Sequence, residues 1–162
     1  MPTISTALAT FVGAEAGLGI EALTKSGFPV RFDTVPAADG GAGPSPTETL
    51  LAALAACTAM DVASILRKKR QRIERYEIAV TAEKADEHPQ VFSSIVVEHR
   101  LVGHLDAEAV RRSVELSATS YCPVSAMLSE SVPIEHRYRL RRTPSEAEGA
   151  SELVVLTGPT PR

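Results

Sequence analysis

The feature that most constrains the fold of this chain is a helix that is apolar on almost every side. Ser45, Pro46 and Glu48 make a strong helix start, with a capping serine, a proline at the first helical position and a glutamate three residues after the serine. The stretch from Leu50 to Cys57 that follows contains only leucine, alanine and cysteine. These signals predict a helix from Ser45 to about Arg70. Because it is apolar all round in its first half, we expect it to be central and buried.

Short strands are predicted ahead of this helix. Glycine, serine and proline punctuate the first third of the chain, which is typical of strands joined by tight turns. The stretch Ala37 to Gly43 contains consecutive glycines and is predicted to be a flexible loop. The expected strands are Thr3–Val12, Leu18–Lys25 and Pro29–Thr34.

Strands and helices also follow one another after the long helix. Alternating side chains predict strands, an aspartate predicts a helix start, and Pro123 predicts a helix break at Cys122. Segregated blocks of strands and helices indicate an α+β fold with antiparallel pairing. From Thr143 onward the composition shifts to proline, serine, glutamate and glycine, so we expect one domain over residues 1–142 and a flexible or added tail over 143–162. The expected elements are strands at Tyr76–Thr81, Val91–Val102 and Val132–Leu140 and helices at Asp106–Tyr121 and Val124–Ser129.

Composition excludes several classes of protein. The net charge of −3 argues against binding to nucleic acid, whose partners are usually basic. The N-terminus has no basic region ahead of an apolar block, as a secretory signal would. The longest unbroken apolar run is shorter than the roughly 18 residues that cross a bilayer. We therefore expect a cytoplasmic protein that binds neither nucleic acid nor membrane.

The chain has two cysteines, Cys57 and Cys122. In the cytosol, where structural disulfides are rare, such a pair is more often redox-active or catalytic. Cys122 precedes Pro123 at a predicted helix start, where backbone N–H groups can lower a thiol pKa. The other interpretation is that Cys122 packs as a small apolar residue, and these residues alone leave both open.

The other candidate functional residues can also be explained by a purely structural role. Glu48 can complete the capping box with Ser45, and Arg31 can pair with Asp33 or point into solvent. Asp61 follows Cys57 by one helical turn and faces the same side. The spacing of the histidines is unsuited to a metal site, and no cofactor-binding motif is present, so we expect neither metal nor cofactor. The histidines are His88, His99, His104 and His136.

Three segments together resemble the OsmC/Ohr family, the osmotically induced and organic-hydroperoxide-resistance proteins. They are Gly43–Glu48, the alanine-rich helix that bears Cys57, and Ser120–Ser125. The resemblance covers about residues 3–142. The stretches Leu116–Cys122 and Val132–His136 are most similar to the less characterised OsmC-like branch.

The resemblance implies a fold and a chemistry. The fold is an intertwined homodimer in which sheets from both chains wrap the long central helices. The implied activity is reduction of hydroperoxides, with Cys57 attacking the peroxide and Cys122 resolving the sulfenic acid as a disulfide. A dithiol or lipoylated protein would reduce that disulfide. Arg31 and Glu48 would activate Cys57.

The expected substrate is an organic hydroperoxide, because apolar side chains of the long helix would line the site. These are Leu50, Ala53, Leu54 and Met60. Where the best-studied peroxidases carry the glutamate that orients their arginine, this chain has Thr47, one residue before Glu48. The alternative function is therefore an OsmC-like dimer without efficient peroxidase activity, which binds a small ligand or senses redox state.

Overall fold

The computed structural model describes residues 4–13 and 16–160. The chain divides into two compact units, Met1–Leu50 and Leu51–Arg162. Thr3, the first residue of the first predicted strand, lies outside the described residues. The last two residues of the chain, which end the predicted tail, also lie outside them.

The first unit contains a three-stranded antiparallel sheet. Its strands are β1 (Ala7–Phe11), β2 (Ile20–Thr24) and β3 (Pro29–Phe32), in the order β1-β2-β3. All three predicted strands are thus confirmed in position. A short 3-10 helix, η1 (Ala37–Asp39), lies within the predicted loop. Asp33 follows β3 and accepts hydrogen bonds from the N–H groups of Leu18, Thr34 and Ala42.

The long helix α1 (Pro46–Lys68) begins and ends where the sequence predicts. The capping box forms, because the Ser45 N–H donates to Glu48 Oε2 at 2.7 Å and the Glu48 N–H donates to Ser45 Oγ at 3.3 Å. At the other end Arg70 has a φ of 58°, and its N–H donates to the Arg67 carbonyl. A left-handed residue with this bond is a common helix stop.

Only one stripe of α1 is buried within a single chain. The buried residues are spaced by four and share one face: Leu54, Thr58, Val62 and Leu66. The prediction of a helix covered on every side is therefore not met by one chain alone, since Met60 is 68% exposed. By length and composition α1 could also cross a bilayer, because it has 23 residues and a stretch of mean hydropathy 1.9. The core helix of a soluble protein passes the same test, so the feature is weak evidence for a membrane span.

The second unit contains a four-stranded sheet in the order β4-β5-β6-β7. Its strands are β4 (Arg75–Lys84), β5 (Phe92–Val102), β6 (Ile134–Arg141) and β7 (Glu152–Thr157). β4 pairs antiparallel with β5, and β6 with β7. β5 and β6 are parallel, so the prediction of wholly antiparallel pairing is wrong for this pair. The helices between β5 and β6 return the chain to the end of the sheet from which β5 began, as a parallel connection requires.

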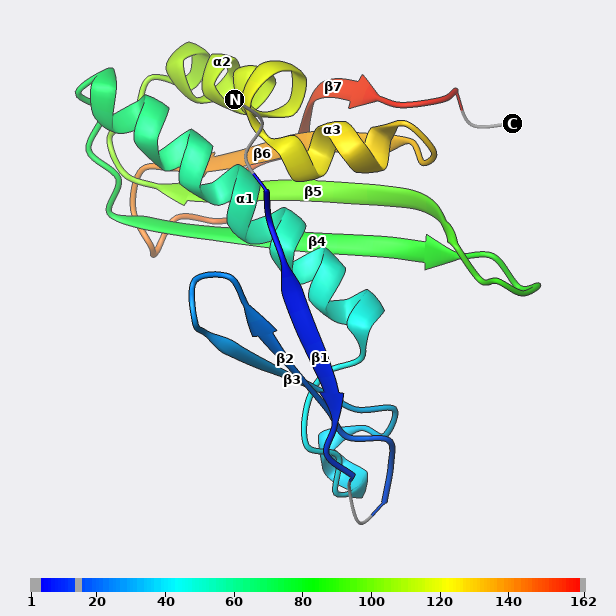
Figure 1. The fold of residues 1–162 in the computed structure, drawn as a ribbon. Helices are drawn as coiled ribbons and strands as arrows, with labels where there is room; N and C mark the ends of the chain where they lie inside the picture. Colours follow the sequence, from blue (N-terminus) through cyan, green and yellow to red (C-terminus); the bar gives the residue numbers. More distant parts are fainter. Residues whose placement is uncertain (1–3, 14–15, 161–162) are drawn as a thin grey trace. The chain divides into compact units, whose positions relative to one another are not determined.

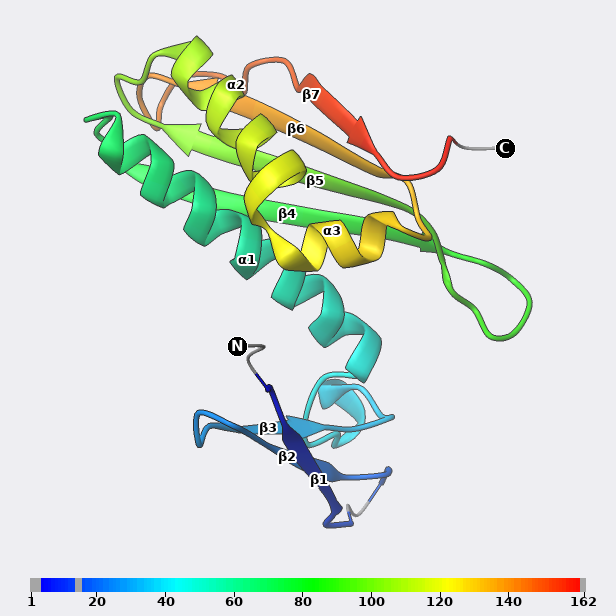
Figure 2. The same ribbon diagram turned by 45° about the horizontal axis from the view of Figure 1, so that its top comes forward.

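Helices cover one face of this sheet. α2 (Ala107–Leu116), α3 (Pro123–Ser129) and residues 51–68 of α1 lie on the same side of the strands (Figures 1 and 2). Inward-facing residues alternate along β5 and β6, and they pack against the buried stripe of α1 in two apolar clusters. One cluster contains Leu54, Ile95, Val97, Cys122, Val132 and Ile134. This packing brings α1 and the start of α3 together.

Candidate functional site

The two cysteines meet between α1 and the start of α3. Cys57 is half-buried on α1, and Cys122 is buried with 2% of its surface exposed. Both are free thiols. Their sulfur atoms and one carboxylate oxygen of Asp61 all lie within 4.8 Å of one another. Two reactive sulfurs and an acid therefore share one small site.

The local backbone explains how Cys122 reaches this place. α2 runs on into one π-helical turn, Ser117–Tyr121, and the Cys122 N–H donates to the Ser117 carbonyl at 2.9 Å. Cys122 then takes an extended conformation ahead of Pro123, as the proline predicts. Its sulfur accepts from the Ser125 N–H at 3.3 Å. The predicted helix-capping position of Cys122 is thus confirmed.

The environment of Cys122 favours the neutral thiol. Burial, and after it the neighbouring Cys57 side chain, raise the pKa of the Cys122 thiol to about 12, against a lowering by the Ser125 N–H. The N–H groups of the helix start do lower this pKa, but the net shift is upward, so the hypothesis of a Cys122 thiol with a lowered pKa is wrong. α3 has only seven residues, and removal of the sulfur from water outweighs the favourable backbone hydrogen bond.

A buried chain of polar side chains leads away from Asp61. The Ser117 hydroxyl donates to Asp61 Oδ2 at 3.0 Å, and Ser117 Oγ lies 3.1 Å from Thr58 Oγ1. Thr58 Oγ1 lies 3.5 Å from His99 Nε2, and the Tyr76 hydroxyl lies 2.6 Å from His99 Nδ1. The sequence did not predict this series of hydrogen-bonded side chains, and of its members only Asp61 had been noted near Cys57. The alternation of apolar residues along Val91–Val102 was the one signal that could have placed His99 on the buried face.

The histidine and the tyrosine of this hydrogen-bonded series are held neutral. Burial, and after it the charge of His136, lower the pKa of His99 to about 3. Burial, and after it the charge of Asp61, raise the pKa of Tyr76 well above its usual value. The His99 imidazole and the Tyr76 phenol are therefore uncharged at pH 7.

Arg31 and Glu48 lie in the first unit, whereas Cys57 and Cys122 lie in the second. The Arg31 side chain is 68% exposed and forms an ion pair with Glu21, with 3.1 Å between Nε and Oε2. Its partner is therefore on the neighbouring strand β2 rather than Asp33. Glu48 is exposed and completes the capping box. The role of both residues beside Cys57 stays a prediction.

The expected substrate-lining residues have different environments. Leu54 is fully buried and belongs to the apolar cluster that contains Cys122. Ala53 and Met60 are exposed on α1 in the single chain, and Leu50 is 39% exposed. Their contact with a substrate stays a prediction. Leu54 is the member of the set that packs in the same cluster as both cysteines.

Cys57, Asp61 and Cys122 are also the residues that could hold a metal ion. Two sulfurs and one carboxylate oxygen within 4.8 Å of one another form a donor set that suits a soft divalent cation such as zinc. The histidines do not add to this set. His99 is hydrogen-bonded within the polar chain, and His136 Nε2 lies 3.4 Å from Ser125 Oγ. Among the residues that the structure describes, His136 Nδ1 is buried without a hydrogen-bond partner.

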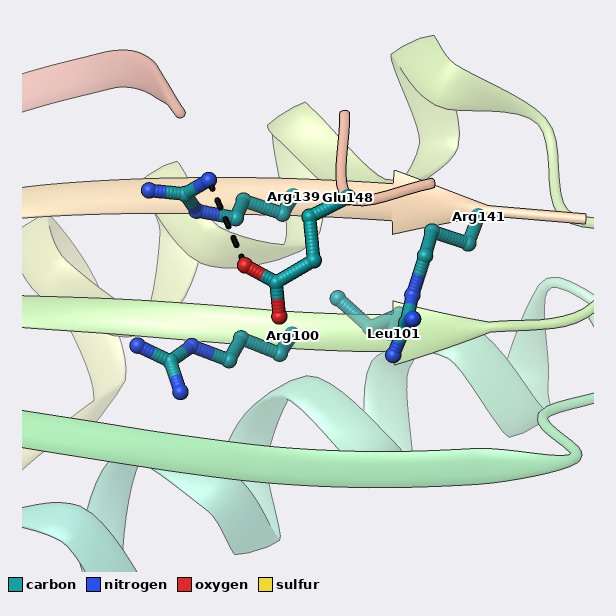
Figure 3. Close-up of a pocket in the computed structure, with 5 residues that line it drawn as sticks. All are labelled: Arg100, Leu101, Arg139, Arg141 and Glu148. Atoms are coloured by element: carbon teal, nitrogen blue, oxygen red, sulfur yellow. Dashed lines mark ion pairs between the residues drawn. The ribbon is translucent and has the colours of Figure 1, made fainter. Parts of the chain in front are cut away.

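A second charged cluster lies on the strands β5 and β6 of the same unit, where it lines a small pocket (Figure 3). Glu98 accepts from Arg100 and from Arg139, each at 2.8 Å, and Arg139 also pairs with Glu148 at 3.7 Å. The pocket has a volume of about 10 Å³, room for about one water molecule. Because Arg100 and Arg139 pair with acidic partners, this cluster is a structural ion-pair network rather than an anion site.

The family of the chain follows from comparison with known proteins. The model of the OsmC family, described as OsmC-like protein, matches residues 38–137, which include both cysteines and Asp61. That match covers more than half of the chain. This chain therefore belongs to the OsmC-like family.

Individual relatives agree with that assignment. Protein YhfA of Escherichia coli K12 is 42% identical over 106 residues, which span 63% of this chain and 79% of YhfA. The OsmC-like protein from Mycoplasma pneumoniae superposes with a TM-score of 0.74 at 17% identity, over 88% of this chain and all of that one. An organic hydroperoxide resistance protein OsmC from Legionella pneumophila gives a TM-score of 0.57 at 17% identity, over 88% of this chain and all of that one. At such identities the two structures show the fold alone.

Proposed function

We propose that this OsmC-like protein is a two-cysteine peroxidase that reduces hydroperoxides, organic ones in preference. The observation that carries the proposal is the approach of two free thiols from separate elements, with their sulfurs within 4.8 Å. Such a pair can close into a disulfide after a modest movement, because an S–S bond is about 2 Å long. The family includes organic hydroperoxide resistance proteins, which supports the same chemistry.

The two cysteines have different roles in this cycle. Cys57 is the more exposed of the two cysteines, whereas Cys122 is buried and its pKa is raised, so we expect a hydroperoxide to meet Cys57 first. Cys57 therefore attacks the terminal peroxide oxygen, and the O–O bond breaks. An alcohol departs, and Cys57 is left as a sulfenic acid. Cys122 then attacks the Cys57 sulfur, which gives a disulfide and water. The preference for an organic hydroperoxide rests on the apolar side chains of α1 that are proposed to line the site, Leu50, Ala53, Leu54 and Met60.

The remaining steps need partners. A dithiol, most simply a lipoylated protein, reduces the disulfide by thiol–disulfide exchange and restores both thiols. The cytoplasm, where thiols are kept reduced, suits this cycle. Arg31 and Glu48 are proposed to activate Cys57, as the family resemblance implies. Their contribution is measured by the rate constant for hydroperoxide consumption in Arg31→Lys and Glu48→Gln.

A homodimer completes the proposal. The exposed face of α1 carries Met60, and β1 is exposed along its whole length with Leu8 and Phe11 at its surface. Apolar side chains in this number are usually covered by another chain. We propose that a second copy of this chain binds here and buries the face of α1 that is exposed in the single chain.

The activity is tested by steady-state consumption of cumene hydroperoxide and of hydrogen peroxide with dihydrolipoamide as reductant. The proposal expects faster turnover of cumene hydroperoxide and no turnover in Cys57→Ser. In Cys122→Ser the sulfenic acid persists and is labelled by dimedone. Equal rates in wild type and Cys57→Ser would show that Cys57 is not the attacking thiol.

A further inference from the structure

Asp61 lies beside both cysteines. It lies one helical turn after Cys57, and its carboxylate oxygen is within 4.8 Å of both sulfur atoms. Within residues 4–13 and 16–160, no lysine, arginine or histidine forms an ion pair with Asp61. A half-buried carboxylate in this position is therefore available to exchange a proton with a thiol.

The buried polar chain holds this carboxylate in place. Ser117 is fully buried and donates to Asp61 Oδ2 at 3.0 Å, which orients the carboxylate. Thr58 and His99 are also fully buried. Thr58 is within hydrogen-bond distance of Ser117, and His99 is within hydrogen-bond distance of Thr58. A group whose hydrogen bonds are made by buried side chains is fixed in direction, as an acid–base residue requires.

The closure of the disulfide needs such a residue. The Cys122 thiol must lose its proton to become a nucleophile, and burial disfavours the free thiolate. The hydroxyl on the Cys57 sulfur must gain a proton to leave as water. One group close to both sulfurs can perform both transfers, directly or through one water molecule, because each sulfur lies within 4.8 Å of the carboxylate oxygen.

We propose that Asp61 is the acid–base residue of disulfide closure, an inference that rests on the proposed peroxidase function. The carboxylate takes the proton from the Cys122 sulfur, which forms an S–S bond with Cys57 as the S–O bond breaks. The leaving hydroxide takes the proton from Asp61 and departs as water. Sulfenic acid and thiol thus become disulfide and water, Asp61 returns to its ionised form, and the earlier hydroperoxide is the sole oxidant.

The test separates the first chemical step from the second. Reduced wild type and Asp61→Asn are mixed with one equivalent of cumene hydroperoxide, and hydroperoxide loss and disulfide formation are followed by rapid quench and mass spectrometry. Asp61→Asn is expected to consume hydroperoxide within about threefold of the wild-type rate and to close the disulfide about 100-fold more slowly, the size typical of a lost general base. The sulfenic acid then accumulates and is labelled by dimedone.

Matched variants distinguish proton transfer from structural support. Asp61→Asn keeps a side-chain oxygen that can accept the hydrogen bond from Ser117. Asp86→Asn is the control: it removes an exposed carboxylate from the β4–β5 loop, and both steps are expected to keep their wild-type rates. Asp61→Ser is the second variant if Asp61→Asn does not fold. Disulfide closure at the wild-type rate in a folded Asp61 variant, or equal slowing of both steps, would overturn the assignment.

A peroxide-free readout keeps this inference separate from the proposed function. Ellman's reagent forms a mixed disulfide on Cys57, and attack by Cys122 releases a second coloured thiolate. Asp61→Asn is expected to slow this second release at least tenfold. If wild type consumes no hydroperoxide but the second release still depends on Asp61, the peroxidase proposal fails and the role of Asp61 in closure stands. Unchanged release in Asp61→Asn overturns that role.

Discussion

The sulfur of Cys57 and the sulfur of Cys122 lie within 4.8 Å of one another although the residues come from different helices. α1 presents Cys57 from the middle of the long helix, and the π-helical turn after α2 delivers Cys122 to the start of α3. Both elements are fixed by packing on the sheet, so the approach of the sulfurs is a property of the fold. The peroxidase proposal depends on this approach.

The two thiols are expected to differ in reactivity. Cys122 is 2% exposed and its pKa is raised, whereas Cys57 is half-exposed. At pH 7.5, iodoacetamide should alkylate Cys122 in Cys57→Ser at least ~10-fold more slowly than Cys57 in Cys122→Ser. Both variants should react at similar rates in 6 M guanidinium chloride, which removes the effect of burial. Faster alkylation of Cys122 in the folded protein would contradict the assigned roles.

The buried histidines are expected to make stability depend on pH. Burial lowers the pKa of His99 to about 3 and that of His136 to about 4, so between these values and about 6.5 the unfolded chain binds more protons than the folded one. Stability from these groups is therefore complete above pH 6.5 and is lost as the pH falls. Each histidine contributes up to ~1.4 kcal/mol per pH unit in this window.

Urea unfolding at pH 7, 6 and 5 measures this dependence. His99→Gln with His136→Gln removes the titrating groups and should flatten the profile over this range, even if the variant is less stable throughout. A wild-type profile that is already flat between pH 7 and 5 would mean that the two histidines are not held neutral by burial.

Glu98 is expected to stabilise the sheet through its arginines. Its side chain is 11% exposed and accepts from Arg100 and Arg139, so Glu98→Gln removes the carboxylate partner of Arg100 and leaves Arg139 with the carboxylate of Glu148. Chemical denaturation should show a loss of about 1 to 3 kcal/mol. Glu148→Gln is the matched control, since Glu148 is 56% exposed and should change stability by less than about 0.5 kcal/mol. Equal effects of the two substitutions would contradict this assignment.

The exposed side of α1 is expected to form a dimer interface. In sedimentation at micromolar concentration the protein should have twice the mass of the 17.2 kDa chain. Met60→Lys places a charge on the exposed apolar side of α1 and should weaken the dimer at least tenfold. Met127→Lys makes the same change at an equally exposed methionine of α3 and is the control. A monomeric wild type would contradict the proposed assembly.

Local signals predicted most of the elements and their order. The capping box at Ser45, the proline after Cys122 and the alternation along β5 and β6 depend on neighbouring residues, which a single sequence displays. The parallel pairing of β5 with β6 depends on residues distant in the chain and was missed. The same holds for the pairing of β7 with β6, which places residues 152–157 in the sheet.

The candidate site was predicted only in part, because some of its contacts also join residues that are distant in the chain. The cysteines were found because they are rare and sit at distinctive positions. Asp61 was noted on the helix face of Cys57 but was not predicted as a site residue. The chain through Thr58, Ser117 and His99 joins three elements by side-chain hydrogen bonds. No local spacing encodes such a contact, and serine and threonine have many ordinary uses in helices.

The central claim is tested most directly by counting thiols after a single oxidation. Fully reduced protein is mixed with one equivalent of cumene hydroperoxide, quenched within seconds, and its free thiols and intact mass are measured. The account predicts the loss of two thiols and of two hydrogen atoms per chain, with Cys57 joined to Cys122 within that chain, and no such product in Cys57→Ser. Two thiols still free after minutes would contradict it.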